Sequence, residues 1–295
     1  MIYLDNSATT RTMDEAADAA RRFMCEGFFN PSSAYSPAVE AERRVNAARA
    51  RLAGAMSVLA EEVLFTSGGT ESNNMAIMGT LKAIRGSGRI VVGATEHPSV
   101  YETIHALKDA YAVVDAPVNG EGKTDIEALA GRLTSDTLFV SIMQVNNETG
   151  AVNDIPAIYK LMRQRAPKAL LHVDGVQGFL KVPFDARNCD FYSLSGHKFH
   201  APKGVGALYA RKGVRFAGGQ TGGGQERNLR SGTTNTPGIM GMDAAVMAYL
   251  ANLNEYREAM RSAKLRLAKN LLSLPDTVLN GPAAQEGAPH ILNIS

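Results

Sequence analysis

A lysine, Lys198, stands in the segment SLSGHKFHAPKGVG, directly after the strand-like run DFYSL. A lysine that loses its proton can condense with an aldehyde, and burial beside an apolar strand lowers its pKa. Ser195 and His197 offer a hydroxyl and an imidazole that could donate hydrogen bonds to a phosphate. The segment therefore indicates a covalent site for an aldehyde that carries a phosphate, although the spacing alone fits an ordinary surface loop equally well.

A carboxylate and an amide, Asp174 and Gln177, follow the apolar run LLHV. A pyridine ring is the better electron sink when its nitrogen is protonated, and a carboxylate at the end of a strand would keep it so. Gln177 could then reach a hydroxyl group on the same ring. Together with Lys198 these residues point to pyridoxal phosphate (PLP). An aspartate that caps the following helix is the alternative explanation.

A Gly-Gly turn joins a strand-like run to a helical one in FTSGGTESNN, which contains Gly69 and Thr70. Backbone N–H groups at the start of a helix form a cradle for phosphate. A plain turn with Thr70 as the helix cap gives the same pattern. The segment is therefore weak evidence by itself.

Two further polar segments follow strand-like runs, TEHPS with His97 and VNNETG with Asn147. The imidazole of His97 could stack on a flat ring, and Asn147 would stand among amides and a carboxylate at a strand end. A structural histidine and an Asx turn are the separate alternatives. Because every one of these segments ends a strand-like run, one shared site explains them better than a series of accidents.

Short apolar runs alternate with longer helical patterns along most of the chain. Strands that are apolar on both faces are typical of a buried parallel sheet, and the alternation predicts a three-layer α/β domain. Loops at the carboxyl ends of such strands carry the chemistry. The expected strands are 63–66, 89–94, 137–142, 170–174, 191–194 and 205–210, and the expected helices are 13–26, 38–56, 70–84, 99–110, 126–132 and 154–165.

The pattern changes after Gly238, where residues 241–272 predict one long helix that could link two domains. The final run, HILNIS, predicts a short strand of a second domain that is cut short at Ser295. We expect residues 13–245 to form the large domain and residues 246–295 to begin an incomplete small domain. Residues 1–12 are expected to belong to the small domain.

The composition argues against several classes of protein. The chain has 295 residues, 45% of them apolar, and a net charge of +2, which is too balanced to indicate nucleic-acid or membrane-surface binding. Its two cysteines, Cys25 and Cys189, argue against a disulfide framework. With no signal peptide and no apolar run of about 18 residues, we expect a cytoplasmic protein without a membrane span or a metal site.

The motifs together resemble those of cysteine desulfurases of the nitrogen-fixation and iron–sulfur-assembly type. These belong to the class V aminotransferase family of PLP-dependent fold type I enzymes. The resemblance covers residues 1 to 295 and rests on the segments YLDNSATT, FTSGGTESNN, TEHPSV, VNNETGAVNDI, HVDGVQ, SGHKFHAPKGVGALY and GGGQERNLRSGTTNTPGI. It implies a three-layer α/β/α PLP-dependent large domain with a mostly parallel sheet, plus a truncated small α+β domain.

The resemblance also implies a role for each residue. Lys198 resembles the lysine that holds PLP as a Schiff base, and His97 the histidine that stacks on its ring. Asp174 is similar to the partner of the pyridine nitrogen, and Gln177 to the contact of the ring hydroxyl. Asn147 resembles an amide near that hydroxyl and the substrate.

The phosphate ligands follow in the same way. Thr233 resembles a threonine that reaches the phosphate of a neighbouring subunit, which implies a homodimer. The resemblance implies cofactor-binding positions in the two phosphate segments at Gly69, Thr70, Ser195 and His197.

In such enzymes sulfur leaves L-cysteine, L-alanine is released, and a separate cysteine becomes a persulfide that supplies a scaffold protein for iron–sulfur clusters. That cysteine and a substrate-binding arginine lie beyond the position that corresponds to Ser295. Neither Cys25 nor Cys189 occupies the matching motif, so this chain alone is expected to be inactive in forming a persulfide on a cysteine of its own, even if PLP binds. Another class V aminotransferase or lyase, or a non-catalytic PLP-binding dimer, are the remaining alternatives.

Overall fold

The computed structural model describes residues 2–84 and 86–295. The chain divides into two compact units. The first unit comprises Met1–Ile84, Asp185–Arg187 and Ser193–Ala251, and the second comprises Arg85–Phe184, Asn188–Tyr192 and Asn252–Ser295.

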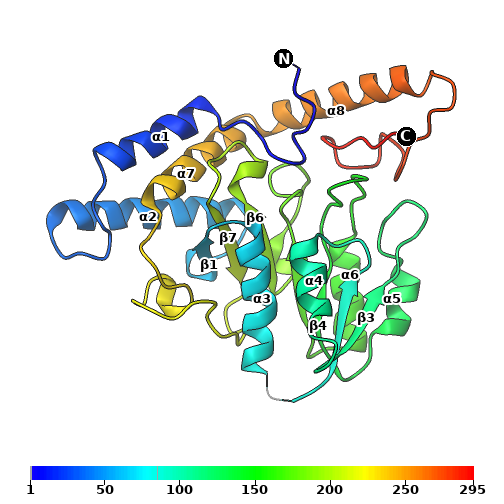
Figure 1. The fold of residues 1–295 in the computed structure, drawn as a ribbon, viewed down its shortest axis with the longest axis horizontal. Helices are drawn as coiled ribbons and strands as arrows, with labels where there is room; N and C mark the ends of the chain where they lie inside the picture. The colour runs from blue at the N-terminus through cyan, green and yellow to red at the C-terminus, as the bar shows by residue number, and fades with distance from the viewer. Residues whose placement is uncertain (1, 85) are drawn as a thin grey trace. The chain divides into compact units, whose positions relative to one another are not determined.

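Helices dominate the first unit. Both α1 and α2 pack against α7 (Figure 1). The backbones of α1 and α7 approach closely, since a Cβ at Gly241 would lie 2.8 Å from the carbonyl oxygen of Ala16. Its helices are α1 (Asp14–Cys25), α2 (Ser36–Ala55), α3 (Gly69–Ala83) and α7 (Thr236–Ala251), with the strands β1 (Val63–Thr66) and β7 (Gly206–Ala210).

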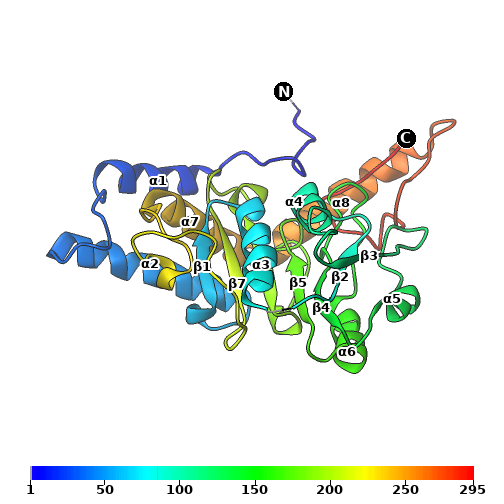
Figure 2. The same cartoon turned by 60° about the horizontal axis from the view of Figure 1, so that its bottom comes forward.

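The second unit contains a parallel sheet. β2 (Arg89–Gly93) pairs with β3 (Ala112–Ala116) and with β4 (Thr137–Ser141), which in turn pairs with β5 (Leu170–Asp174) (Figure 2). Because these strands are parallel, the carboxyl ends of β2, β4 and β5 lie along one edge. The helices of this unit are α4 (Pro98–His105), α5 (Ile126–Arg132), α6 (Ile155–Arg165) and α8 (Leu253–Leu271).

Shorter elements complete the chain. β6 (Phe191–Ser195) begins in the second unit and ends in the first. Single turns of 3₁₀ helix occur at η1 (Ala60–Glu62), η2 (Ala186–Asn188), η3 (Gly196–Lys198) and η4 (Glu226–Asn228).

Two expectations need correction. The helix expected at 241–272 is two helices, because Asn252 takes the non-helical angles φ −127° and ψ 25° between α7 and α8. The HILNIS run forms no strand among the described residues; Ile294 makes only an isolated bridge to Leu279. β1 pairs with β7 in antiparallel fashion, with Val63 opposite Tyr209, which agrees with a sheet that was expected to be mostly, and not wholly, parallel.

Most other elements agree with expectation within a few residues, and the bounds of β1, β5 and α5 agree fully. β3 was not expected from the sequence, because four of its five residues are exposed or only half-buried and give a weak apolar signal. No helix in the described part of the chain is long and apolar enough to cross a membrane.

Candidate active site

Lys198 lies in the first unit, at the end of the 3₁₀ turn η3 that follows β6. The turn is anchored where the Gly196 N–H donates to the carbonyl of Val205 at 2.9 Å. The half-buried Lys198 side chain donates from Nζ to the carbonyl oxygens of Ser7 and Ala8, at 2.5 and 2.8 Å. These two carbonyls fix the direction in which the amine points.

The N-terminal segment fixes the same turn through its threonines. The Thr10 amide and hydroxyl both donate to the carbonyl of His197, each at 2.9 Å. Thr9 Oγ1 lies 3.1 Å from His197 Nδ1, and the His200 amide donates to Thr10 Oγ1 at 2.8 Å. Nothing local in the sequence assigns Thr9 and Thr10 to the lysine, although the motif YLDNSATT contains them.

The turn before α3 lies beside Ser195 within the first unit. Gly68 has φ 155°, and a Cβ there would lie 3.5 Å from Ser195 Oγ. A Cβ at Gly206 would lie 2.7 Å from the Cα of Gly68, so the backbone of β7 closes this side of the turn. The start of α3 at Gly69 therefore lies close to the buried hydroxyl of Ser195, and the N–H groups that begin a helix can bind phosphate.

Asp174 ends β5 in the second unit and is only 5% exposed. Its Oδ1 accepts the Val176 N–H at 2.9 Å, and its carbonyl accepts the Gln144 N–H at 2.9 Å. The carboxylate is thus held by the turn that follows the strand, and the backbone of Asp174 by the segment that follows β4. The alternative explanation, that Asp174 caps a helix, does not hold, because Val176 lies in a hydrogen-bonded turn and not in a helix.

The turn after Asp174 is packed without spare room. A Cβ at Gly175 would lie 1.9 Å from Cζ of Tyr192, and one at Gly178 would lie 1.9 Å from Oε1 of Gln144. The Tyr192 hydroxyl donates to Gln144 Oε1 at 2.7 Å, so both obstacles are fixed. This packing positions Gln177, which is 4% exposed, within the turn.

His97 follows β2 and caps α4. Its Nδ1 accepts the Ser99 N–H at 3.1 Å and lies 2.8 Å from Ser99 Oγ. A nitrogen that accepts a backbone N–H carries no proton, so the neutral ring carries its proton on Nε2. The exposed imidazole can therefore exchange a proton at Nε2.

Glu96 is buried directly beside His97, and the sequence did not single it out. Its Oε1 accepts the Met143 N–H, whereas Oε2 has no hydrogen-bond partner among the described residues. Burial, and secondly the charge of Asp174, raises the pKa of Glu96 well above its ordinary value. Glu96 therefore holds its proton more tightly than an ordinary carboxyl group does, in part because of the negative charge of Asp174.

Asn147 follows β4, and the Asx turn considered for this segment belongs to its neighbour Asn146. Asn146 Oδ1 accepts the N–H groups of Glu148 and Thr149 at 2.9 and 2.8 Å, and its Nδ2 donates to the Thr95 carbonyl at 3.1 Å. Asn146 thus ties the loop after β4 to the loop after β2. Asn147 is left half-buried at the edge of the sheet.

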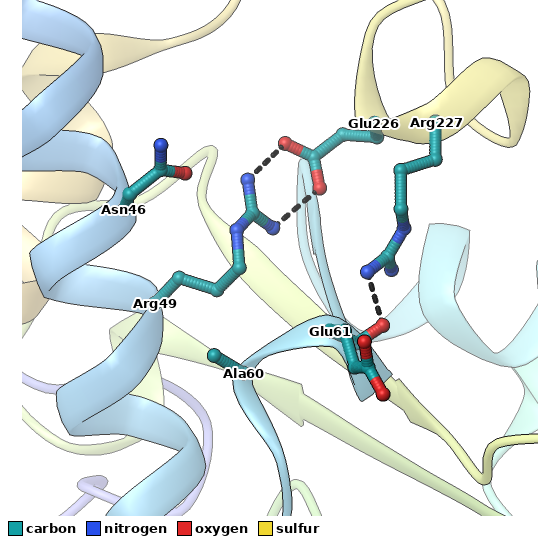
Figure 3. Close-up of a pocket in the computed structure, with 6 residues that line it drawn as sticks. All are labelled: Asn46, Arg49, Ala60, Glu61, Glu226 and Arg227. Atoms are coloured by element: carbon teal, nitrogen blue, oxygen red, sulfur yellow. Dashed lines mark hydrogen bonds and ion pairs between the residues drawn. The ribbon is translucent and has the colours of Figure 1, made fainter.

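Thr233 is exposed in the first unit, in the segment that follows η4. That segment is held by the ion pair of Arg230 with Glu71 at 2.8 Å and by the pair of Arg49 with Glu226 at 2.7 Å. The second pair borders a pocket of about 360 Å³, in which Arg49 and Glu226 face one another (Figure 3). None of the site residues expected from the sequence lines this pocket.

The expected residues therefore form two groups. Each group lies within one compact unit, which fixes the geometry inside the group. The first unit holds Gly69, Thr70, Ser195, His197, Lys198 and Thr233, and the second holds His97, Asn147, Asp174 and Gln177.

Comparison with known proteins adds independent information. The aminotransferase class-V family matches residues 2–295. The protein named cysteine desulfurase IscS from Methanosarcina thermophila is 38% identical over 294 residues, which cover 98% of this chain and 72% of that protein. These values place the chain well within the range in which a family is shared.

Solved structures agree on the fold. A structure titled NifS-like protein matches with a TM-score of 0.96 and 35% identity, covering all of this chain and 81% of that one. A second, titled SspA in complex with cysteine, matches with a TM-score of 0.86 and 28% identity, covering all of this chain and 83% of that one. Both confirm the expected α/β fold with a mostly parallel sheet. The chain belongs to the aminotransferase class-V family, and its relatives there include proteins named cysteine desulfurases.

Proposed function

We propose that this chain is a PLP-dependent cysteine desulfurase that supplies sulfur for iron–sulfur cluster assembly. The observation that carries the proposal is the Lys198 turn, which follows β6 and holds the amine in one direction through two carbonyls. The names of the relatives support cysteine as the substrate.

The overall reaction balances without any further reagent. L-cysteine and a thiol give L-alanine and a persulfide: the carbon–sulfur bond breaks, a sulfur–sulfur bond forms, and one thiol proton ends on the β-carbon. The substrate carbon is reduced while the accepting sulfur is oxidised. No external oxidant or reductant is therefore required.

The residues present fit PLP. The start of α3 and the nearby Ser195 hydroxyl suit a phosphate, since helix N–H groups and a hydroxyl can donate hydrogen bonds to its oxygens. Asp174 supplies a buried carboxylate that suits a protonated ring nitrogen. When bound, PLP supplies the electron sink that stabilises negative charge on the substrate's α-carbon.

The chain's own residues then have separate tasks. We assign phosphate binding to Gly69, Thr70, Ser195 and His197. We assign covalent attachment of the cofactor to Lys198. His97 is positioned to exchange a proton at Nε2, because Ser99 occupies its Nδ1.

Asp174, Gln177 and Asn147 complete the assignment. Asp174 pairs with the ring nitrogen, Gln177 with the ring hydroxyl, and Asn147 lies near the substrate.

The experiment is to incubate the purified chain with PLP, L-cysteine and excess dithiothreitol. Because the added thiol accepts the sulfur, the assay measures cleavage of the carbon–sulfur bond without assigning a cysteine of the protein to that task. We expect equimolar alanine and sulfide, and none from Lys198→Ala. The matched control, Lys203→Ala, alters an exposed lysine of the same segment and should leave the rate unchanged.

The outcome that rejects the proposal is a preparation that binds PLP and forms no alanine. Formation of pyruvate from L-cysteine, or transfer of the amino group to a keto acid, would instead identify the lyase or aminotransferase alternative.

We further propose a homodimer, a sulfur-accepting scaffold protein as partner, and a cytoplasmic location. Thr233 is exposed in the isolated chain, which leaves it available to a second copy. The described cysteines Cys25 and Cys189 form no disulfide, in keeping with a reducing compartment. Sedimentation equilibrium of the wild type would reject the dimer if it returned the monomer mass at micromolar concentration.

A further inference from the structure

A buried lysine, Lys181, lies in the same turn as Gln177 and has no task in the proposed reaction. It is 4% exposed, as is Gln177. A lysine is almost never buried to this extent unless its ammonium group meets an acceptor. The burial of Lys181 therefore indicates that hydrogen-bond acceptors lie around its ammonium group.

The Lys181 ammonium faces the oxygen end of Gln177. Its Nζ lies 3.5 Å from Gln177 Oε1. An ammonium group donates hydrogen bonds and accepts none, so an amide beside it must turn its oxygen toward it. The Lys181 contact therefore favours the orientation in which the Gln177 oxygen faces the ammonium group.

A second side chain lies at the same oxygen. His290 Nε2 is 3.3 Å from Gln177 Oε1. His290 is held in place by its neighbour Ala288, whose N–H donates to the Gly150 carbonyl at 2.8 Å and whose carbonyl accepts from Lys264 Nζ at 2.9 Å. Two nitrogen groups from different segments therefore lie at one amide oxygen.

The backbone cannot compensate for a change in this amide. The neighbouring residue Gly178 lies against Gln144, and a Cβ at Gly178 would lie 1.9 Å from the side-chain oxygen Oε1 of Gln144. The remaining freedom of Gln177 is in its side chain. Fixing Oε1 consequently fixes where the NH₂ group can donate.

We propose that Lys181 is a positioning residue, which holds the Gln177 amide so that its NH₂ group, and not its oxygen, is presented to an acceptor oxygen on the cofactor ring. This inference rests on the proposed function, in which Gln177 contacts the ring hydroxyl. It predicts that the ring oxygen is bound as an acceptor, and hence that its anionic form is favoured. Lys181 acts through Gln177 and does not itself touch the cofactor.

The test is a double-mutant cycle with PLP affinity as the readout. Lys181→Met removes the charge and the donors and keeps a side chain of similar length. Lys181→Met and Gln177→Ala should each weaken PLP binding roughly tenfold, which corresponds to about 1.4 kcal/mol. The double variant should bind no more weakly than Gln177→Ala alone.

A second readout does not depend on turnover. Titration of the absorbance band of bound PLP against pH should shift in Lys181→Met in the same direction as in Gln177→Ala. Lys181→Arg, which keeps a charged donor, should restore both affinity and titration to near the wild type. Lys168→Met, at an exposed lysine, is the surface control and should change neither.

The outcomes separate the two ideas. If Gln177→Ala binds PLP normally, the assignment of Gln177 is wrong, and the inference falls with it. If Gln177→Ala weakens PLP binding and Lys181→Met does not, only the positioning role of Lys181 is wrong. The same conclusion follows if Lys181→Met weakens PLP binding equally in the wild type and in Gln177→Ala. If Lys181→Met does not fold, His290→Phe removes the other nitrogen group at the Gln177 oxygen and replaces it in the double-mutant cycle. A loss of PLP affinity on His290→Phe that persists in the Gln177→Ala background would overturn the inference.

Discussion

His172 gives the chain a sharp dependence of stability on acid. Its side chain is fully buried within β5, where Nδ1 lies 2.7 Å from Ser141 Oγ and the ring stacks on Phe139. Burial lowers the pKa of His172 from 6.5 to about 3. In the folded chain the imidazole therefore remains neutral at pH values where the unfolded chain has already bound a proton.

The sign and the size follow from this difference. A histidine whose pKa is lowered on folding contributes its full stability above the unfolded value of 6.5, and that stability is lost as the pH falls toward about 3. Each pH unit in this window costs about 1.4 kcal/mol. Acidification from about pH 6.5 to about pH 4.5 should therefore remove on the order of 3 kcal/mol through this residue.

The assay is urea unfolding of the wild type and of His172→Asn at several pH values in this range. The variant keeps a polar group near Ser141 and cannot bind the proton. The difference in unfolding free energy between the two proteins should move in favour of the variant by about 3 kcal/mol as the pH falls over two units. A difference that stays constant within about 0.5 kcal/mol would refute the assignment of a buried, neutral His172.

Three further predictions concern residues that the sequence did not single out. Because the pKa of Glu96 is raised on folding, the wild type should lose stability as the pH rises above the ordinary carboxyl range, and Glu96→Gln should not. The unfolding free energy of the variant should therefore gain on that of the wild type by up to about 1.4 kcal/mol per pH unit. Urea unfolding of both proteins at pH 5 and 7 measures this gain, and an equal difference at the two pH values would show that Glu96 is ionised in the folded chain. Gly175→Ala should lower the free energy of unfolding by about 1–3 kcal/mol or more, because its Cβ would lie 1.9 Å from a buried tyrosine ring. Gly131→Ala is the control on α5, where a Cβ has no atom within 4 Å, and it should leave stability unchanged or raise it. Thermal melting of the two variants beside the wild type measures both effects. Arg49→Ala should lower the unfolding free energy by about 3–5 kcal/mol. The reason is that the largely buried Glu226 carboxylate loses its bidentate partner. A loss below about 1 kcal/mol would mean that solvent already screens this ion pair.

The sequence predicted the strands that precede the expected site residues wherever the signal was local. The run LLHVD predicted a buried strand that ends in Asp174, and the structure has that strand with the same bounds. The run DFYSLSGHK likewise predicted a strand that ends just before Lys198. Both patterns depend only on neighbouring residues, which is why they could be recognised without the fold.

The partners of these residues could not be predicted in the same way. Thr10 reaches His197 across 187 positions of sequence, and Glu96 meets Met143 across 47. Neither contact leaves a periodic or compositional trace. Asn252 illustrates the same limit in the helices, since a single non-helical residue separates α7 from α8 although the residues on both sides favour a helix.

The central claim is that Lys198 holds the cofactor. The most direct measurement is to incubate the chain with PLP, reduce it with borohydride, digest it and locate the modified lysine by mass spectrometry. The account predicts one stoichiometric pyridoxyl group on the peptide that contains Lys198, and none on Lys181 or Lys203. A pyridoxyl group on another lysine, with Lys198 unmodified, would contradict it.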